Sequence, residues 1–267
     1  MPAASGPRRD PGAGALLALR VLLVVALFFA WYALVSWRVL DAFFFGRSFV
    51  VLQRVWQWFA SGKIYPHLGV TLVETVLAFA VGTVLGVAAG LWLGLRALPS
   101  MLLEPYIKAA NAMPRVILAP IFAVWFGLGI ASKVALGITL VFFIVFFNVF
   151  QGVREVSPVV LASVRMLGAT RRQLLRHVYL PSATSWVFSS LHISVGMAFV
   201  GAVVGEYLGS AAGVGYLILQ AEGTFDIDSV FAGILVLTAF ALLLDFAVTR
   251  AERHLLTWHP RASAHEW

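Results

Sequence analysis

The chain lacks cysteine and is poor in charge. None of its 267 residues is Cys, and 12% are Asp, Glu, Lys or Arg, against roughly 25% in soluble domains. The absence of cysteine excludes disulfides, thiolate metal sites and cysteine nucleophiles. With 61% apolar residues and a mean hydropathy of +0.93, the chain has too little polar surface for water. We therefore predict a membrane protein.

Sequence signatures of catalysis are also missing. The chain has no G-x-x-x-x-G-K-[ST], no H-E-x-x-H and no G-x-S-x-G, so we expect no P-loop, zinc-protease or serine-hydrolase chemistry. The run "GVGYLI" at 213–218 is not a dinucleotide fingerprint. We expect no enzyme activity, cofactor or metal in this chain, and a transporter or channel is favoured over an intramembrane enzyme.

Six apolar segments reach the roughly 20 residues that a spanning helix needs. The expected fold is an all-α membrane protein with six transmembrane helices, at 15–37, 68–95, 105–126, 132–153, 184–206 and 229–250. The first segment is too long for a signal peptide and no small-residue cleavage pattern follows it, so we interpret it as an anchor.

These spans divide the chain into four parts. Residues 1–14 are rich in Pro and Gly and are expected to be a disordered cytoplasmic N-terminus. Residues 15–67 hold the first span and an external segment, whose aromatic and cationic part is suited to the membrane interface. Residues 68–255 form the transmembrane core, and residues 256–267 a cytoplasmic tail.

The distribution of charge sets the orientation. Segment 154–181 holds five arginines and one acid, whereas segment 207–228 holds three acids and no Lys or Arg. Positive charge accumulates on the cytoplasmic side, which places both termini and segment 154–181 in the cytoplasm. Four cations fall on the external side in this arrangement and are exceptions to the positive-inside rule: Arg38, Arg47, Arg54 and Lys63.

Small residues form a stripe along the second span. Gly82, Gly86, Gly90 and Gly94 recur every four residues, so they share one helix face on which another backbone can approach closely. We interpret this stripe as a helix-packing surface.

The third span contains prolines and a charge. Pro114 and Pro120 each remove a backbone donor and are expected to kink or interrupt the helix. Arg115 is a candidate for function because charges within spans are costly. The alternatives are that Arg115 reaches the cytoplasmic interface or pairs with an acid such as Glu104.

Further polar residues lie within the other spans. Glu74, Glu206 and Asp245 are near span ends, where water is one explanation of them, whereas Asn148 and His192 are deeper and suit a cavity or a bond between helices. The candidate translocation-path residues are Asn111, Pro114, Arg115, Asn148, His192 and Glu206.

Segment 154–181 has the signals of two short helices. Ser157 with Pro158 can start the first helix, and Gly168 suits a left-handed stop. Thr170 and Gln173 match a capping box that starts the second helix, expected to end at Pro181. A DNA-binding helix-turn-helix, a solvated basic loop and a docking element for a cytoplasmic protein are the three interpretations. The first is disfavoured, because a short module between two spans has poor access to DNA.

The stretch "REVSPVVLASVRMLGATRRQLLRHVYLPSA" resembles the cytoplasmic coupling loop of ABC importer permeases. The family pattern has E-A-A, three further residues, Gly, and later an apolar residue with Leu-Pro. Gly168 and Tyr179-Leu180-Pro181 match it, while Ala162 stands where the family has Glu. The segments "MPRVILAPIFAVWFGLGIASK" and "VGEYLGSAAGVGYLI" are similar to the nitrate/sulfonate/taurine branch, and the resemblance covers about residues 65–255.

This resemblance implies a type I ABC importer permease in a bacterial inner membrane. Its implied partners are two cytoplasmic ATPase subunits that bind ATP and Mg²⁺, a second permease copy, an extracytoplasmic solute-binding protein and membrane lipid, with no nucleic acid. The implied solute is a small anion such as a sulfonate, taurine or nitrate, and a secondary transporter or channel is the alternative. The residues expected to couple to the ATPase are Leu161, Ala162, Val164, Leu167, Gly168, Ala169, Arg171, Arg172, Leu174, Leu175, Leu180 and Pro181.

Overall fold

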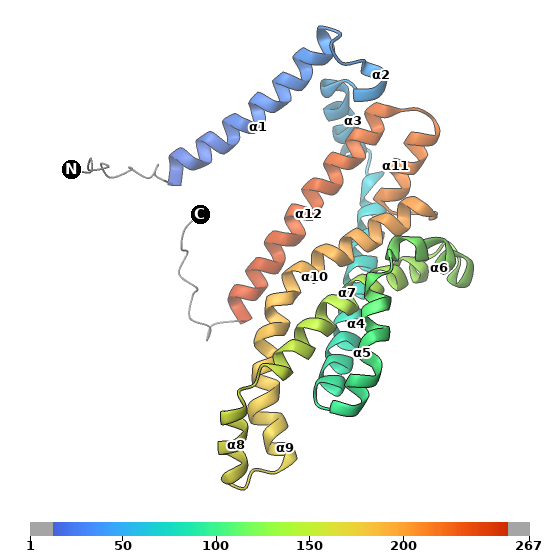
Figure 1. Cartoon of the computed structure of the whole chain (residues 1–267). Coiled ribbons are helices and arrows are strands. Elements are labelled where there is room, and N and C mark those ends of the chain that lie inside the picture. Colours follow the sequence, from blue (N-terminus) through green and yellow to red (C-terminus); the bar gives the residue numbers. More distant parts are fainter. Residues whose placement is uncertain (1–12, 256–267) are drawn as a thin grey trace, which may run out of the picture.

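The computed structural model describes residues 13–255, and within them regular secondary structure is entirely helical (Figure 1). The expected tail at 256–267 lies outside the described residues. So does the expected disordered N-terminus, except for residues 13 and 14, which begin the first helix. The helices are α1 (Ala13–Ser36), α2 (Ala42–Phe45), α3 (Ser48–Ala60), α4 (Ile64–Gly94), α5 (Ala97–Ala112), α6 (Leu118–Phe126), α7 (Ile130–Arg154), α8 (Pro158–Met166), α9 (Arg171–Leu174), α10 (Leu180–Leu208), α11 (Val214–Gly223) and α12 (Ile227–Leu255).

Five of these helices contain a stretch that is long and apolar enough to cross a membrane: α1, α4, α7, α10 and α12. A sixth candidate span consists of α5 together with the 3-10 turn η1 (Arg115–Ile117) and α6, which meet at a bend of 76°. The all-helical membrane fold predicted from hydropathy is therefore confirmed, with five spans, or six when this broken pair is counted as one.

The break in the third span lies at Met113 and Pro114, and the span begins earlier than predicted, at Ala97. The expectation that Pro120 also interrupts the helix is wrong. Pro120 occupies the first turn of α6, which begins at Leu118. A helix leaves its first four N–H groups without an internal partner, so a proline there removes no helical hydrogen bond.

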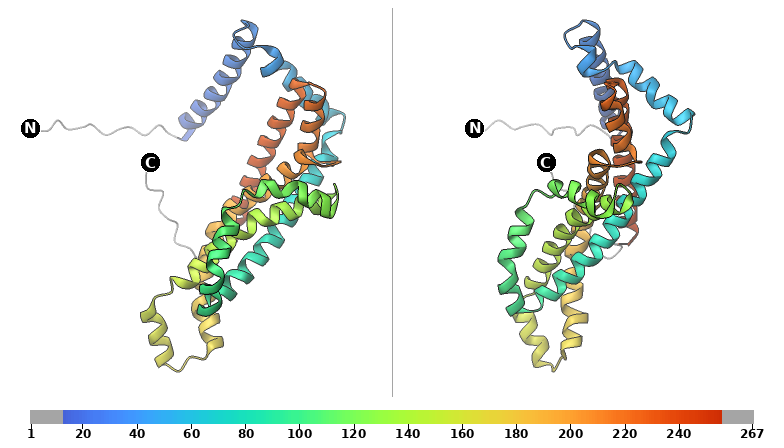
Figure 2. Two further views of the ribbon diagram at one scale, coloured as in Figure 1. Left: turned by 45° about the vertical axis from the view of Figure 1, so that its right-hand side comes forward. Right: turned by 90° about the vertical axis from the view of Figure 1, so that its right-hand side faces the viewer.

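Different short helices form the two ends of the molecule (Figure 2). We call the end formed by α8 and α9 the hairpin end, and the end that carries α2, α3 and α11 the opposite end. Helices α4, α7 and α10 run side by side between them, while the N-terminal part of α1 diverges from the bundle.

The stripe of glycines on α4 lies against a row of valines on α7. A Cβ atom added to any of the four glycines would lie 2.8–2.9 Å from a valine Cβ, closer than real Cβ atoms come. The facing pairs are Gly82 with Val141, Gly86 with Val145, Gly90 with Val149 and Gly94 with Val153. These valines are buried and form one hydrophobic core with Ala78, Ala183 and Ala198.

A second core lies toward the opposite end. It joins α3, α11, α12 and the start of α4 through nine buried side chains: Val51, Trp58, Ile64, Val214, Leu217, Ile218, Ala232, Val236 and Leu237. The segment predicted to be external thus contains a packed helix, because Val51 and Trp58 of α3 are buried in one core with residues of α11 and α12.

Two of the four cations that are exceptions to the predicted orientation have acidic partners. The guanidinium of Arg47 lies 2.6 Å from Asp228, whose other oxygen accepts the Arg47 backbone N–H, also at 2.6 Å. Arg54 lies 3.5 Å from Asp226. The acidic loop and these two arginines therefore lie at the same end of the molecule, and their charges offset one another.

Candidate coupling element and translocation path

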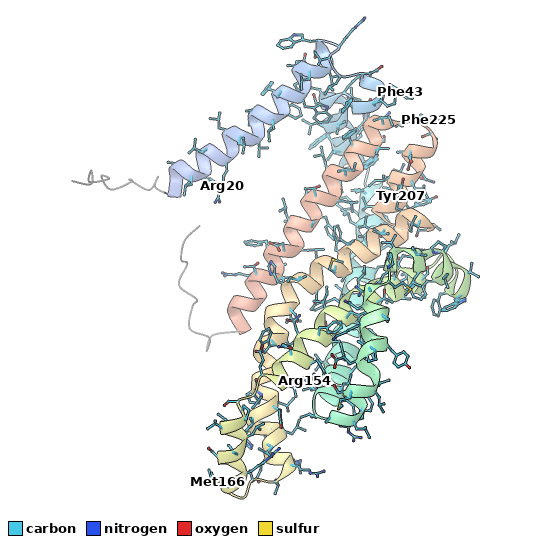
Figure 3. The ribbon with its side chains drawn as sticks, in the orientation of Figure 1. Arg20, Phe43, Arg154, Met166, Tyr207 and Phe225 are labelled. Carbon is cyan, nitrogen blue, oxygen red and sulfur yellow. The ribbon has the colours of Figure 1, made fainter. Side chains whose placement is uncertain are left out.

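The helix pair of segment 154–181 is built by local capping. The expectation that Ser157 caps α8 is wrong, because its side chain makes no capping hydrogen bond, and Pro158 in the first turn favours the helix start instead. Gly168 follows α8 with a φ of +80°, a conformation that favours glycine. Thr170 and Gln173 form the capping box of α9, since each side chain accepts the other residue's backbone N–H. The pair forms the tip of the hairpin end (Figure 3).

The second helix does not end at Pro181, so that expectation is wrong. From Leu175 to Tyr179 the chain makes a π turn, η2, and α10 follows from Leu180 without a gap. A proline inside an α-helix lacks an N–H and its ring crowds the carbonyl four residues earlier. The wider π turn contains that residue, His177, and so accommodates Pro181. As a result, α9 and the span α10 form one continuous helical rod.

The hairpin exposes apolar side chains at its tip and at the start of α8. Met166 and Leu167 at the tip are 82% and 87% exposed, and Val159 in the first turn of α8 is 73% exposed. Arg165, Arg171 and Arg172 near the tip are also exposed. Four of the predicted coupling residues are half-buried in this segment: Leu161, Val164, Ala169 and Leu175. Leu174 is buried, so it cannot present its side chain to a partner. Sequence reasoning missed Met166 and Val159, whose exposure depends on how the two helices pack.

The break in the third span gathers three of the predicted path residues. Arg115 of η1 donates hydrogen bonds to the backbone carbonyl and the side-chain oxygen of Asn111 across the break at Pro114. Its guanidinium lies 4.5 Å from the ring centre of Phe143, midway along α7, which is a cation–π contact. The Arg115 Nε is buried and has no hydrogen-bond partner in the structure.

The acid proposed as an alternative partner of Arg115 is engaged elsewhere. Glu104 lies 2.7 Å from Lys108 and 3.9 Å from Arg154. Pairing of Arg115 with Glu104 is therefore not observed, and the neutral Asn111 is its partner instead.

Asn148 and His192 line two separate cavities. The Asn148 side chain donates to the Ile144 carbonyl of its own helix and lines a cavity of about 430 Å³ that also contains Lys108 and Arg154. His192 of α10 lies 2.7 Å from Asp245 of α12, and this pair lines an apolar cavity of about 310 Å³. The structure thus does not bring these two residues together with Arg115.

Glu206 belongs to a buried polar cluster, and the explanation of Glu74 and Glu206 by contact with water is wrong. Glu74 of α4 is 1% exposed, Glu206 of α10 is 0% exposed and Lys133 of α7 is 1% exposed. Lys133 donates to the Leu128 carbonyl at 2.6 Å, and Glu206 accepts the hydroxyl of Thr71 at 2.6 Å. We call Thr71, Glu74, Lys133 and Glu206 the polar cluster. Sequence reasoning overlooked Lys133, although it is a lone cation at the start of a span.

The polar cluster also reaches α11. The backbone N–H of Gly215 donates to Glu206 at 2.7 Å, and that of Val214 donates to Thr71 at 3.2 Å. Within residues 13–255, no group of three or more His, Cys, Asp or Glu side chains is placed to hold a metal ion.

Taken together, six spans with a broken third member, a capped helix pair at one end and charged groups buried between spans define a subunit of a membrane transport system. The chain belongs to the family of binding-protein-dependent transport system inner membrane components, which it matches over residues 82–257. It is therefore an ABC permease, a multi-pass inner-membrane protein and a transmembrane subunit rather than a catalytic one.

Relatives of the chain are named for different solutes. It is 30% identical over 256 residues, 96% of this chain and 93% of the relative, to the putative aliphatic sulfonates transport permease protein SsuC of Bacillus subtilis. It is 33% identical to the formylaminopyrimidine transport permease protein ThiX of Halalkalibacterium halodurans, covering 76% and 81% of the two chains. It is 28% identical to the taurine transport system permease protein TauC of Escherichia coli, covering 90% and 88%.

The fold also has a solved counterpart. A chain of the inward-facing MetNI methionine ABC transporter superposes with a TM-score of 0.61 at 20% identity, covering 71% of this chain and 94% of that chain. This likeness supports the type I importer fold that the coupling-loop resemblance implied.

Proposed function

We propose that this chain is the transmembrane subunit of an ATP-driven importer in which α8 and α9 dock onto a cytoplasmic ATPase. Two permease copies form the pathway, and a solute-binding protein delivers the solute to the opposite end. ATP and Mg²⁺ bind to the ATPase subunits. The family to which the chain belongs supports both partners, since its members depend on a binding protein.

The observation that carries the proposal is the exposed apolar tip of a well-ordered hairpin. One capping box, a proline in the first turn of α8 and a left-handed glycine fix the pair, although apolar side chains at its tip, Met166 and Leu167, are more than four-fifths exposed. Exposed apolar side chains on a structured element are a sign of a protein-binding surface. The surrounding arginines suit an acidic rim on the partner.

The continuous rod from α9 to α10 supplies a mechanism of coupling. Because the π turn keeps α9 and α10 in one helix, a displacement of the hairpin by the ATPase is passed directly to the fifth span. ATP shifts the inward-facing and outward-facing states only through its different affinity for them. The rigid rod from α9 to α10 joins the docking site to the span, so a displacement of the hairpin that accompanies ATP binding also moves the span.

Docking can be tested with the double substitution Met166→Ser and Leu167→Ser. We expect co-purification of the ATPase and solute uptake to fall at least about tenfold, because removing two buried apolar contacts at an interface costs roughly 2–4 kcal/mol. The matched control, Met166→Leu with Leu167→Met, keeps the surface apolar and should retain both. Full ATPase association of the serine variant in a correctly inserted permease would refute docking at this tip.

We further propose that the solute is a small organic anion, such as a sulfonate or taurine, and that Arg115 contacts it. The buried, unpaired Nε of Arg115 at the break of the third span supports this proposal, since a buried donor without an acceptor suits an incoming anion. Two other predicted path residues also lie at this break: Pro114 ends α5, and Asn111 accepts hydrogen bonds from Arg115. The names of the SsuC and TauC relatives agree with an anion, while that of ThiX indicates a pyrimidine.

The anion proposal is tested by mass spectrometry of the ligand that co-purifies with the cognate binding protein, together with Arg115→Gln. We expect an anionic ligand and a loss of uptake of roughly tenfold or more, with ATPase association unchanged. Arg96→Gln is the control, because Arg96 also lies over an aromatic ring, that of Trp92 at 5.8 Å, but outside the break. A neutral pyrimidine as the bound ligand would overturn the anion assignment and leave the importer proposal intact.

A further inference from the structure

The N-terminus of α11 is held by three side chains from two different spans. Successive backbone N–H groups at residues 213, 214 and 215 donate to His67 Nδ1 at 3.1 Å, Thr71 Oγ1 at 3.2 Å and Glu206 Oε2 at 2.7 Å. His67 and Thr71 lie one turn apart on α4, and Glu206 lies on α10. The first N–H groups of a helix have no partner within it, so α4 and α10 here supply all three acceptors.

The glycines of the run "GVG" make this approach possible. Gly213 has a φ of +104°, and a Cβ there would collide with the Glu206 carboxyl group. A Cβ on Gly215 would lie 2.6 Å from the Val203 carbonyl oxygen of α10. The run thus brings the start of α11 into direct contact with α10.

The attachment is buried and polar. Thr71 and Glu206 are both 0% exposed, and the carboxylate of Glu206 lies at the positive end of the α11 dipole, where an anion is stabilised. Lys133 of α7 also belongs to this cluster: its aliphatic stem packs against Gly205 of α10, and its ammonium group donates a hydrogen bond to the carbonyl of Leu128. The polar cluster therefore joins α4, α7, α10 and α11.

The C-terminus of α11 is exposed at the opposite end. Gln220, Glu222 and Gly223 near its C-terminus are exposed, while Val214, Leu217 and Ile218 pack in the second core. Figure 1 shows α11 between the ends of α10 and α12 at the opposite end. The helix has one buried, bonded terminus and one that is accessible to a partner.

We propose that His67, Thr71 and Glu206 are positioning residues that make α11 move as one body with α4 and α10. Through this attachment, docking of the solute-binding protein at the opposite end is transmitted to the spans. The inference rests on the proposed function, because it needs a binding protein and an ATPase whose activities respond to each other.

The attachment itself is tested by hydrogen exchange of the permease in lipid nanodiscs. Thr71→Val removes the acceptor of the Val214 N–H, and His67→Phe removes that of the Gly213 N–H while keeping a ring to stack on Tyr216. We expect each amide to exchange roughly tenfold faster. Thr75→Val is the matched control, because Thr75 is equally buried on α4 and its hydroxyl bonds only to the carbonyl of Thr71. Unchanged exchange in both variants would show that these bonds do not hold α11.

Transmission is tested in the reconstituted complex of permease, cognate ATPase and cognate binding protein. We expect His67→Phe and Thr71→Val to reduce stimulation of ATP hydrolysis by the binding protein at least about fivefold and to leave the unstimulated rate and complex assembly unchanged, since the hairpin end is untouched. A merely structural role would lower assembly and both rates together. Normal stimulation despite faster amide exchange would also overturn the proposal. Because His67 is only half-buried, His67→Phe is expected to fold even if Thr71→Val does not, and stimulation can then be measured on that variant alone.

Failure of the proposed function gives a different result from failure of the transmission proposal. If the proposed function is wrong, the unsubstituted permease neither binds the ATPase nor shows stimulated hydrolysis, so the variants cannot reduce either. The exchange measurement on the permease alone would still report whether the three bonds hold α11.

Discussion

Gly86 shows how one hydrogen atom in place of a methyl group fixes the contact between two spans. A Cβ there would lie 2.9 Å from both the Phe142 carbonyl oxygen and the Val145 Cβ. We predict that Gly86→Ala lowers the free energy of unfolding by about 1–3 kcal/mol, since α4 and α7 must separate to admit the methyl group. Thermal unfolding of the purified permease in detergent measures this change.

Gly69→Ala on the same helix is the control for Gly86→Ala. No heavy atom lies within 4 Å of a Cβ at Gly69, so alanine there should be neutral or stabilise the helix by roughly 0.5–1 kcal/mol. Equal melting temperatures for the two variants would contradict the close-packing explanation of the glycine stripe.

The regular spacing of these glycines made their shared face predictable from the sequence, but no such pattern marks the polar cluster. Glu74, Lys133 and Glu206 lie near the ends of apolar stretches, where water is the simplest explanation for a charge. They are buried because α4, α7 and α10 converge with α11 around them. That convergence joins residues more than 130 positions apart, which hydropathy along the chain does not encode.

At the scale of elements, hydropathy located the spans well, although the third span begins at Ala97 and not at 105, and two further errors concerned the effect of proline. The apolar runs predicted α1, α4, α7, α10 and α12 because a membrane helix needs only length and low polarity. A proline's effect depends on its position in a turn. Pro114 precedes a helix and ends the one before it, Pro120 lies in a first turn, and Pro181 follows a π turn that absorbs it.

The π turn predicts an effect of Pro181→Ala on coupling. Alanine restores the backbone N–H, and we expect η2 to relax toward a regular α-helix. Removing the extra residue of the turn would rotate α9 relative to α10 by about 100°, the angle of one residue in an α-helix. Uptake should then fall while thermal stability is kept or rises, since proline inside a helix costs about 3 kcal/mol.

Solute uptake and thermal unfolding of Pro181→Ala are the two measurements. Val178→Ala is the control, because it shortens a side chain within the π turn without changing the backbone donors. Full uptake by Pro181→Ala would mean that the π turn does not set the angle between the hairpin and the fifth span.

At the scale of the whole molecule, charge separates the two ends. The hairpin end is rich in arginine, including Arg165, Arg171 and Arg172, which have no acidic partner within 4 Å among the described residues. At the opposite end, Arg47 and Arg54 are paired with Asp228 and Asp226. The positive-inside rule acts on the number of Lys and Arg residues near the spans, and the pairing offsets the charge of two arginines at the end predicted to be external.

This separation predicts the orientation of the chain, which single cysteines can report because the chain has none of its own. Ala162 of α8 and Gly223 of α11 are exposed at the two ends. In right-side-out vesicles, a membrane-impermeant maleimide should label Gly223→Cys directly and Ala162→Cys only after permeabilisation, with the unsubstituted chain unlabelled throughout. Both sites should label equally after permeabilisation, which controls for reactivity. The reverse pattern would place the hairpin outside the cell, where no cytoplasmic ATPase can reach it, and the docking proposal would then be untenable.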